Sequence, residues 1–324
     1  MRVLVTGGAG YIGSIVSARL LAEGHSVTVF DDLSKGHRAA VPGMATFVQG
    51  DIRDGEALSA AISAHGCRAA IHLAGLAEVA ESVVQPERYA SVNTGGTRQL
   101  IESSLATGLE RIVFSSTCSV YGEPEEVPIA EDHPTWPVNP YGASKLAAER
   151  ALHDASMTSE GRLSYVALRY FNACGASGGL GEDHTPESHL IPIALRAARD
   201  GQALRVFGGD YPTRDGTCVR DYVHVLDLAE AHIAALGGPP LNCPINLGTG
   251  RGGSVAGVIL SVERVTGRPV PHEMAPRRPG DPAALVASYS RASELLGWEP
   301  RRSLDDAVRD ADAWLDEHPR GYDD

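Results

Sequence analysis

The sequence has few cysteines and does not arrange them in pairs. Five occur in 324 residues, none in a C-x-x-C motif: Cys67, Cys118, Cys174, Cys218 and Cys243. This pattern argues against a disulfide framework and against a zinc site. We therefore expect reduced thiols, no bound metal and a cytoplasmic location.

Positive charge and long apolar runs are also scarce. Lysine and arginine number 28 against 41 aspartates and glutamates, a net charge of -13. A general nucleic-acid or membrane-surface role is thus disfavoured, and an anionic ligand must be met by local arginines or helix N-termini. The segment 2–6 is too short and too soon followed by glycine to be a signal peptide, and no later run could span a bilayer, so we expect a soluble protein.

Glycines follow the first predicted strand. The apolar residues 3–5 are typical of a buried parallel strand, and a G-x-x-G-x-x-G motif follows at Gly7, Gly10 and Gly13. A helical pattern and a second strand that ends at Phe30 complete a βαβ unit. Glycines at such a turn let the backbone approach a pyrophosphate, which the helix N-terminus attracts. We therefore predict a dinucleotide-binding turn.

An acidic residue stands at the end of the second strand. Asp31 could bond the adenosine ribose hydroxyls and would repel a 2′-phosphate, so NAD is favoured over NADP. Lys35 and Arg38 are evidence against this preference for NAD, because either cation could bind a 2′-phosphate. The simpler interpretation is that both lie in a solvated loop.

Further strand-like runs begin at Thr46, Ala69 and Arg111, and another covers residues 163–170, with helical patterns between them. Strands that alternate with helices predict an α/β fold of Rossmann type, a doubly wound parallel sheet with a smaller C-terminal lobe. Ligands lie at the carboxyl ends of such strands. Four residues are expected there: Asp51, Gly75, Asn93 and Ser115.

The predicted division places residues 1–173 in the NAD-binding domain and residues 174–324 in the C-terminal lobe. A helix-like run from Tyr222 to Leu236 and a strand near Pro244 are expected to pack back on the first domain, so that residues 222–248 belong with it.

Tyr141 and Lys145 suggest proton transfer. Pro140 fits the first turn of a helix, so Tyr141 and Lys145, four residues apart, should share one helical face. A cation beside a phenol lowers its pKa, which would let the phenolate act as a base near neutral pH. Thr117, after the fifth strand, could hydrogen-bond across the site.

The sequence resembles the extended short-chain dehydrogenase/reductase superfamily. The resemblance rests on the glycine motif, Asp31, Thr117, Tyr141 and Lys145, which occur in this order. Blocks in the second half of the chain are similar to those of the UDP-galactose 4-epimerases. They are Arg169–Asn172, Gly175–Ala176, Gly181–Asp183, Val206–Pro212, Asp215–Thr217, Val219–Val225, Asn246–Gly248, Ala275–Asp281 and Leu296–Trp298.

The resemblance implies an isomerase with NAD as cofactor, a UDP-sugar as substrate, and a homodimer formed through helices of the cofactor domain. The catalytic residues would be Thr117, Tyr141 and Lys145. Cofactor contacts are assigned to Gly7, Gly10, Tyr11, Ile12, Gly13, Asp31, Asp32, Ser34, Gly36, Asp51, Ile52, Leu73, Ala74, Gly75, Asn93, Ser115, Tyr141, Lys145, Tyr170 and Phe171. Substrate contacts are assigned to Thr117, Tyr141, Asn172, His189, Leu190, Arg205, Phe207, Arg220, Tyr222, Arg278, Asp281 and Leu285.

In the implied reaction Tyr141 takes the proton of the sugar 4-hydroxyl, Thr117 hydrogen-bonds the same oxygen, and a 4-keto sugar forms while NAD is reduced. Arg220 and Arg278 would hold the diphosphate, as two guanidinium groups suit a dianionic ligand. The keto-hexose then turns over, so that its reduction inverts C4.

Three positions depart from the family pattern. Ala77 stands where many members have a lysine near the cofactor, and His189 where some have asparagine. A buried neutral His189 could still hydrogen-bond a phosphate. Leu285 occupies a position that lines the hexose pocket and is intermediate in size.

UDP-glucose and UDP-galactose are the default sugar pair of the family. UDP-glucuronate is the alternative, because Ala77 and Leu285 depart from the default lining. N-acetyl sugars are disfavoured, since Leu285 is larger than the residues that make room for the acetamide.

Two other classes of protein share part of the pattern. A nucleotide-sugar 4,6-dehydratase would need an Asp-Glu pair after Thr117, where Cys118 and Ser119 stand. A non-catalytic NAD-binding protein would keep the glycines and Asp31 but has no reason to retain the tyrosine and lysine together.

Overall fold

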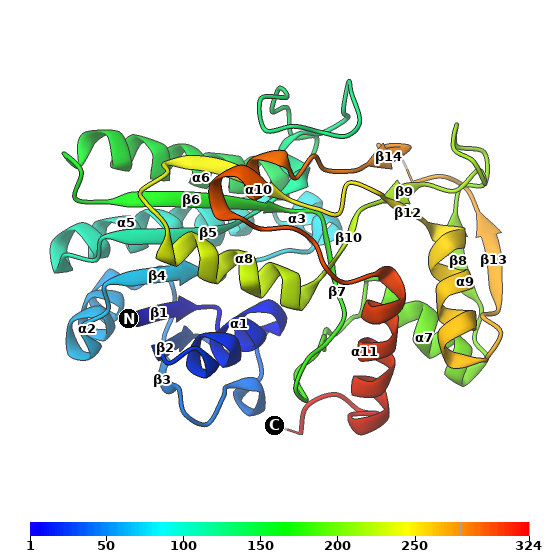
Figure 1. The fold of residues 1–324 in the computed structure, drawn as a ribbon, viewed down its shortest axis with the longest axis horizontal. Coiled ribbons are helices and arrows are strands. Elements are labelled where there is room, and N and C mark those ends of the chain that lie inside the picture. Colours follow the sequence, from blue (N-terminus) through cyan, green and yellow to red (C-terminus); the bar gives the residue numbers. More distant parts are fainter. Residues whose placement is uncertain (279, 324) are drawn as a thin grey trace.

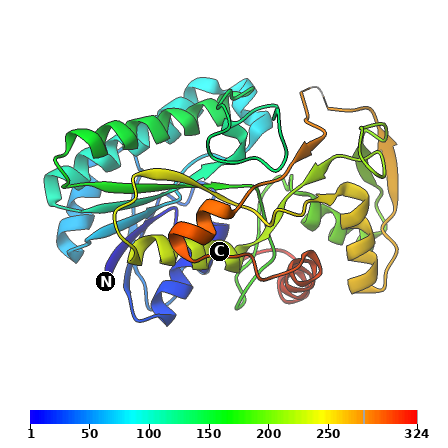
Figure 2. The same ribbon diagram turned by 45° about the horizontal axis from the view of Figure 1, so that its top comes forward.

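The computed structural model describes residues 1–278 and 280–323, which form two lobes side by side (Figure 1). The larger lobe contains a parallel sheet with helices on both faces, and the smaller lobe consists of short strands and helices from the second half of the chain (Figure 2). The two lobes meet near the carboxyl ends of the sheet strands.

Among the described residues, seven parallel strands form the main sheet, in the order β11-β6-β5-β4-β1-β2-β3. Their bounds are β1 (Arg2–Thr6), β2 (Ser26–Asp31), β3 (Thr46–Gln49), β4 (Ala69–His72), β5 (Arg111–Thr117), β6 (Ser164–Tyr170) and β11 (Cys243–Leu247). Strand order reverses at β1, which pairs with both β2 and β4. The carboxyl ends of β1 and β4 therefore flank a crevice suited to a ligand, and the predicted fold class is confirmed.

The sheet is buried because its strands are apolar on both faces. In β1, Val3 and Val5 pack in one hydrophobic cluster with Leu20 of α1 (Tyr11–Ala22) and Leu228 of α8 (Val225–Gly237). Leu4, between them, faces the other way, into a cluster with residues of α2 (Gly55–His65), α5 (Gly96–Thr107) and α6 (Pro140–Thr158). This alternation follows from the two-residue period of a strand and gives the three-layer arrangement of Figure 2.

The segment from Tyr222 to Leu236 differs from its prediction. Tyr222–His224 is not helical but forms strand β10, which pairs in parallel with β7 (Asn172–Cys174). Helix α8 begins only at Val225, where the His224 side chain accepts a hydrogen bond from the backbone N–H of Leu226. The strand forms because a partner far away in sequence satisfies its backbone, which a local pattern does not reveal.

The smaller lobe packs around a separate hydrophobic cluster. It joins α7 (Leu190–Asp200), α9 (Val255–Thr266) and α11 (Leu304–Glu317), and includes Leu195, Val258 and Trp314. The lobe's short strands are β8 (Leu204–Phe207), β9 (Val219–Arg220), β12 (Gly253–Ser254), β13 (His272–Ala275) and β14 (Ala284–Leu285).

The remaining elements lie on the larger lobe. They are η1 (Arg38–Ala40), α3 (Val79–Val84), α4 (Pro86–Tyr89), the π-helix η2 (Ala90–Gly95), η3 (Cys118–Val120) and α10 (Ser290–Leu296). Ala292 of α10 and Trp298 pack into the cluster shared by α1 and α8. Of the helices in the described part of the chain, none is both long and apolar enough to span a bilayer.

Candidate active site

The turn after β1 depends on glycine. Gly7 has a φ of +71°, and a Cβ there would lie 2.5 Å from the backbone nitrogen of Ala74. A Cβ on Gly13 would collide with the carbonyl oxygen of Gly7. Gly10 is the N-cap of α1 and provides no side-chain cap, so the first N–H groups of the helix are left for a ligand. This turn fits a dinucleotide pyrophosphate.

Asp31 is held at the end of β2 with its carboxylate oriented by the backbone. Oδ2 accepts a hydrogen bond from the N–H of Ala9 and Oδ1 one from Leu33, both at 2.9 Å. Burial raises the pKa of Asp31, and these two bonds oppose the rise. Each oxygen retains a lone pair for a ribose hydroxyl.

The two cations that could have favoured a 2′-phosphate have other partners. Lys35 pairs with Glu78 at 2.8 Å, and the Arg38 guanidinium lies 4.6 Å from the centre of the Phe47 ring. The geometry around Asp31 therefore fits NAD better than NADP.

A cavity of about 350 Å³ runs along the carboxyl ends of the sheet strands; we call it the first cavity. Most of the predicted cofactor contacts line it: Gly7, Gly10, Tyr11, Ile12, Gly13, Asp31, Asp32, Ser34, Gly36, Ile52, Leu73, Ala74, Gly75, Ser115, Tyr141, Lys145, Tyr170 and Phe171. Ala77 lines it as well.

Asp51 and Asn93 were predicted to contact the cofactor but are not among the residues that line this cavity. Asp51 is bonded by the Arg53 guanidinium at 2.5–3.1 Å. Asn93 lies in η2 rather than at a strand end, and its amide holds both backbone groups of Leu76, at 2.8 and 3.0 Å. Asn93 thus supports the loop after β4.

Sequence reasoning missed several residues that line the first cavity. Most of them adjoin predicted contacts, so their positions at strand ends were a usable signal, whereas Glu182 and His184 come from a loop that no strand pattern marks. The missed residues are Phe30, Lys35, Gly50, Leu76, Val92, Ser116, Cys118, Ser119, Ala173, Glu182 and His184.

Tyr141 and Lys145 enter the first cavity from the start of α6. The Asn139 side chain caps this helix by accepting from the N–H of Gly142 at 2.8 Å, and Pro140 occupies the first turn. Lys145 is buried and donates from Nζ to the carbonyl oxygen of Ser115 at 2.9 Å. The two side chains thus reach the end of β5.

The pKa of Tyr141 does not shift as the residue spacing predicted. Burial raises the pKa of Tyr141 to about 12, although a hydrogen bond with Thr117 opposes the rise. Burial also lowers the pKa of Lys145 to about 8. The expected lowering of the tyrosine pKa is therefore wrong for the protein alone, because desolvation outweighs the neighbouring groups.

A second cavity, of about 440 Å³, lies in the smaller lobe. Predicted substrate contacts line it: Asn172, His189, Leu190, Arg205, Phe207, Arg220, Tyr222, Arg278 and Asp281. Arg220 pairs with Asp281, and the guanidinium carbons of Arg205 and Arg278 lie 5.2 and 4.1 Å from the Phe207 ring centre. Cationic groups are therefore concentrated here despite the acidic composition.

Leu285 is the predicted substrate contact that lines neither cavity. It lies in β14 and packs against a buried cluster that contains Phe171 and Ile129. Its position behind Phe171 depends on the pairing of β14 with β9. Residues of the second cavity that sequence reasoning missed are Ala173, Cys174, Glu182, Ser188, Ile191, Pro192, Ile193, Ala203, Leu204, Cys218 and Val255.

The two cavities adjoin, because Asn172, Ala173, Glu182 and His189 line both. Although burial favours neutral imidazole, Glu182 and Glu187 raise the pKa of His189 to about 10. The expectation of a buried neutral histidine is therefore wrong at this position. Thr117 and Tyr141 line the first cavity too, and Thr117 pairs in register with Tyr170, two residues before Asn172.

Comparisons with known proteins agree with this geometry. The model of the NAD dependent epimerase/dehydratase family matches residues 3–248. A UDP-glucose 4-epimerase of Streptomyces lividans is 49% identical over 327 residues, with 100% of this chain and 98% of the relative covered.

Solved structures with the same fold include two further UDP-glucose 4-epimerases. The Brucella ovis protein, in complex with NAD, has a TM-score of 0.91 and 45% identity over 96% of this chain and 97% of that one. The Bifidobacterium longum protein, in complex with NAD⁺ and UDP, has a TM-score of 0.93 and 37% identity over 99% and 100%. The family model covers most of the chain, and the Streptomyces lividans relative matches it from end to end. The chain therefore belongs to the NAD dependent epimerase/dehydratase family.

Proposed function

We propose that this protein is an NAD-dependent 4-epimerase that interconverts UDP-glucose and UDP-galactose. The observation that carries the proposal is the junction of the two cavities, with Thr117 and Tyr141 beside it. One cavity has the glycine turn and Asp31 of an NAD site, and the other gathers three arginines and an aromatic ring, which suit a uridine diphosphate. The similar proteins are UDP-glucose 4-epimerases, and their structures hold NAD or UDP.

Tyr141 is the proposed base for the sugar 4-hydroxyl, with Thr117 hydrogen-bonded to the same oxygen. In the protein alone Tyr141 is a neutral phenol, because burial raises its pKa to about 12 and Lys145 is directed to Ser115. When bound in the first cavity, NAD supplies the oxidising power at C4 and a positive charge that favours the phenolate. Bound NAD would therefore favour the phenolate that the protein alone disfavours.

Arg220 and Arg278 are the proposed anchors of the diphosphate. Arg220 is oriented by Asp281 and by a bond from Nη1 to its neighbour's carbonyl, the Val219 oxygen, at 2.7 Å. A diphosphate held here leaves the hexose as the mobile part of the substrate. The 4-keto sugar can then present its opposite face, and its reduction inverts C4.

The structure weighs against the dehydratase alternative. Cys118 occupies the place after Thr117 where that chemistry needs an acid, and burial raises the pKa of its thiol to about 11. A neutral thiol does not supply the proton transfer required to expel water.

UDP-glucuronate is the weaker sugar candidate. A uronate needs a cation near C6, whereas Lys145, beside the proposed base, is used on the Ser115 carbonyl. Leu285, which had favoured this alternative, packs against the cluster that contains Phe171 and lines neither cavity.

We also propose the division predicted from the sequence, with residues 1–173 and 222–248 in the cofactor domain and a nucleotide-sugar lobe formed by most of the remainder. A homodimer through this domain is supported by exposed apolar side chains on its helices, among them Val83 and Val84 of α3 and Met157 of α6. Light scattering of the purified protein measures the mass directly. We propose a cytoplasmic location on the scattered, unpaired cysteines.

The test of the function compares kcat/KM for UDP-glucose, UDP-glucuronate and UDP-N-acetylglucosamine, with the 4-epimers separated by chromatography. We expect UDP-glucose to be preferred. A uronate preference above tenfold, about 1.4 kcal/mol in transition-state binding, would make the default sugar wrong and leave fold and cofactor unchanged. Turnover of none of the three would reject the epimerase assignment.

A further inference from the structure

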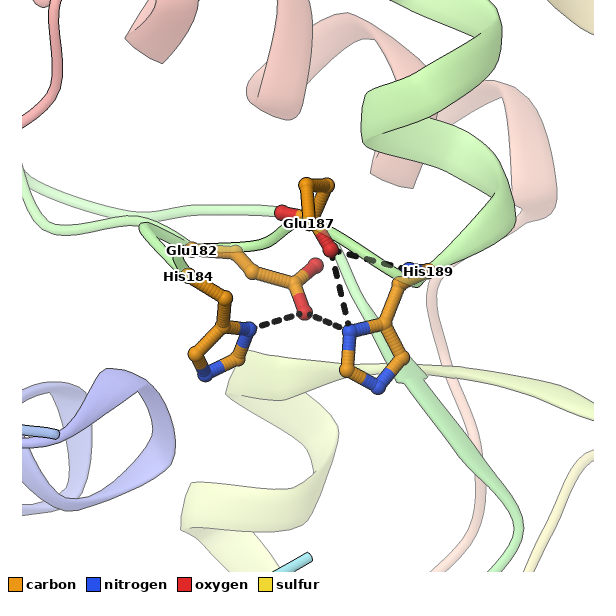
Figure 3. A group of neighbouring side chains, drawn as sticks. All are labelled: Glu182, His184, Glu187 and His189. Atoms are coloured by element: carbon orange, nitrogen blue, oxygen red, sulfur yellow. Dashed lines mark hydrogen bonds and ion pairs between the residues drawn. The ribbon is translucent and has the colours of Figure 1, made fainter. Parts of the chain in front are cut away.

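Two glutamates and two histidines cluster in the loop between β7 and α7, at the wall that separates the two cavities (Figure 3). They are Glu182, His184, Glu187 and His189, and one nitrogen or oxygen of each lies within 4.8 Å of those of the other three. Their spacing, E-x-H-x-x-E-x-H, contains no cysteine. The expectation that no metal is bound follows from the lack of cysteine motifs, and it does not address a site made of glutamate and histidine.

The distances in the cluster suit a small cation. The Nδ1 atoms of both histidines face Oε1 of Glu182, at 3.2 Å for His184 and 2.6 Å for His189, and His189 Nδ1 lies 3.3 Å from Oε1 of Glu187. Tetrahedral zinc with ligands at about 2.0–2.2 Å separates adjacent donor atoms by about 3.3–3.6 Å. Two of the three distances are close to that range. The third, 2.6 Å, is a hydrogen-bond distance, so the His189 ring must move away from Glu182 for an ion to enter.

The two glutamate side chains of the cluster are buried, and one of their oxygen atoms lacks a partner in the described part of the chain. The side chains of Glu182 and Glu187 are only 7% and 4% exposed. Oε2 of Glu187 is a buried atom without a hydrogen-bond partner among the described residues, whereas Oε1 of the same side chain accepts from the backbone N–H groups of Ser188 and His189 at 2.7 and 2.8 Å. The ion pairs that the described residues make with these two carboxylates come from the two histidines rather than from lysine or arginine. A buried carboxylate oxygen without a partner is costly, and a metal ion bound by the cluster would supply the missing contact.

We propose that Glu182, His184, Glu187 and His189 form a binding site for one divalent transition-metal ion, with Zn²⁺ the best fit. Two imidazoles and two carboxylates are a common donor set for zinc, and the two negative charges balance the ion. Softer ions are disfavoured by the lack of sulfur in the cluster, and Ca²⁺ or Mg²⁺ by the two nitrogen ligands.

The position of the site suggests what the ion does. Coordination through Nδ1 fixes each imidazole as its Nε2–H tautomer, and Figure 3 shows Nε2 of His189 directed away from the carboxylates. Because His189 lines both cavities, this N–H becomes a preoriented donor for a phosphate oxygen at the junction. This role, unlike the metal site itself, rests on the proposed function.

The site is tested by metal binding, independently of epimerase activity. Purified full-length protein, stripped with a chelator, is titrated with Zn²⁺ alone by calorimetry, and bound zinc is counted after gel filtration. We expect one equivalent per chain, and affinity at least about 100-fold weaker in Glu182→Gln and in His184→Ala, since even outer-shell partners cost 10–100-fold. His272→Ala, an exposed histidine outside the cluster, is the matched control and should bind as the wild type does.

X-ray absorption of the zinc-loaded wild type keeps the test decisive even if a variant does not fold. Nitrogen and oxygen neighbours at about 2.0–2.2 Å with imidazole scattering would support the site. Sulfur at about 2.3 Å would assign the zinc to cysteines such as Cys174 and Cys218 of the second cavity and overturn the proposal. Failure to bind a stoichiometric ion, or equal binding by the cluster variants and the control, would overturn it as well, whether or not the protein epimerises UDP-glucose.

Discussion

The two cavities bind their ligands by different means. The first lies at the carboxyl ends of regular strands, where glycines and a helix N-terminus without a side-chain cap present the backbone, and Asp31 and Lys145 add charged side chains. The second is formed by loops, short strands and the start of α7, and its arginines are held by a few side-chain contacts, such as those with Asp281 and Phe207. A backbone site depends on the fold as a whole, whereas a side-chain site depends on a few contacts. Mutations should therefore affect the two regions differently.

The largest effect is expected between the cavities, at Tyr141. Tyr141→Phe removes the proposed base and should lower kcat by at least about 100-fold, with little change in the affinity for UDP-glucose. Steady-state kinetics and calorimetric binding measure the two quantities separately. Tyr289→Phe, a tyrosine outside both cavities, is the control. Near wild-type turnover of the Tyr141 variant would exclude it as the base.

In the first cavity, Gly13→Ala should disrupt the cofactor site. The new Cβ meets the Gly7 carbonyl oxygen, so the backbone of the turn must move. Because the moved backbone no longer fits the pyrophosphate, NAD affinity should fall by at least about tenfold. NAD titration followed by fluorescence checks this. Gly43→Ala, where a Cβ meets nothing within 4 Å, is the matched control. Unchanged NAD affinity in the Gly13 variant would show that the turn does not bind the pyrophosphate.

In the second cavity, Arg220→Met should raise KM for UDP-glucose by at least about tenfold and leave NAD affinity unchanged. It removes a proposed diphosphate contact and leaves the Asp281 carboxylate without its cationic partner, so a diphosphate would meet an uncompensated negative charge. The exposed Arg268, changed to Met, is the control. A loss of NAD binding together with UDP-glucose binding would contradict the separate roles of the two cavities.

The smallest effect concerns the stability of the sheet. Burial lowers the pKa of His72 to about 3, and its ring is bonded to Thr6 and Thr97 at 2.7 and 2.9 Å. Between about pH 6.5 and pH 3 the unfolded chain binds a proton at this residue that the folded protein does not, so stability falls as pH falls. Between pH 7.5 and pH 5.5 the free energy of unfolding of His72→Gln should therefore fall by about 1.4 kcal/mol less than that of the wild type.

Urea unfolding at the two pH values measures that difference. His65→Gln, at the partly exposed end of α2, should leave it unchanged. An equal pH dependence in wild type and His72→Gln would mean that His72 is protonated in the folded protein.

The first cavity was largely predictable from the sequence, and the second less so. Gly7, Gly13 and Asp31 lie next to the strands that position them, so a local pattern identifies both residue and role. Asn93 and Leu285 are placed by contacts far along the chain, which no local pattern contains.

Two chemical properties could not be predicted for the same reason. The raised pKa of Tyr141 comes from burial, which outweighs the hydrogen bond with Thr117, while the lysine four residues away donates to the Ser115 carbonyl. The cluster of Glu182 and His189 became recognisable only when folding brought their side chains within hydrogen-bonding distance. Spacing in the sequence indicates which groups are near, but desolvation decides their charge.

The most direct test of the proposed function follows the hydrogen at C4. UDP-glucose that carries deuterium at C4 is incubated with the protein and NAD in ordinary water, and the UDP-galactose formed is analysed by mass spectrometry. If the sugar is oxidised and reduced in one buried site, as we propose, the product retains the deuterium at C4. Formation of UDP-galactose that has lost the deuterium to solvent, or failure to form it, would contradict a 4-epimerase that works through a 4-keto sugar at Tyr141.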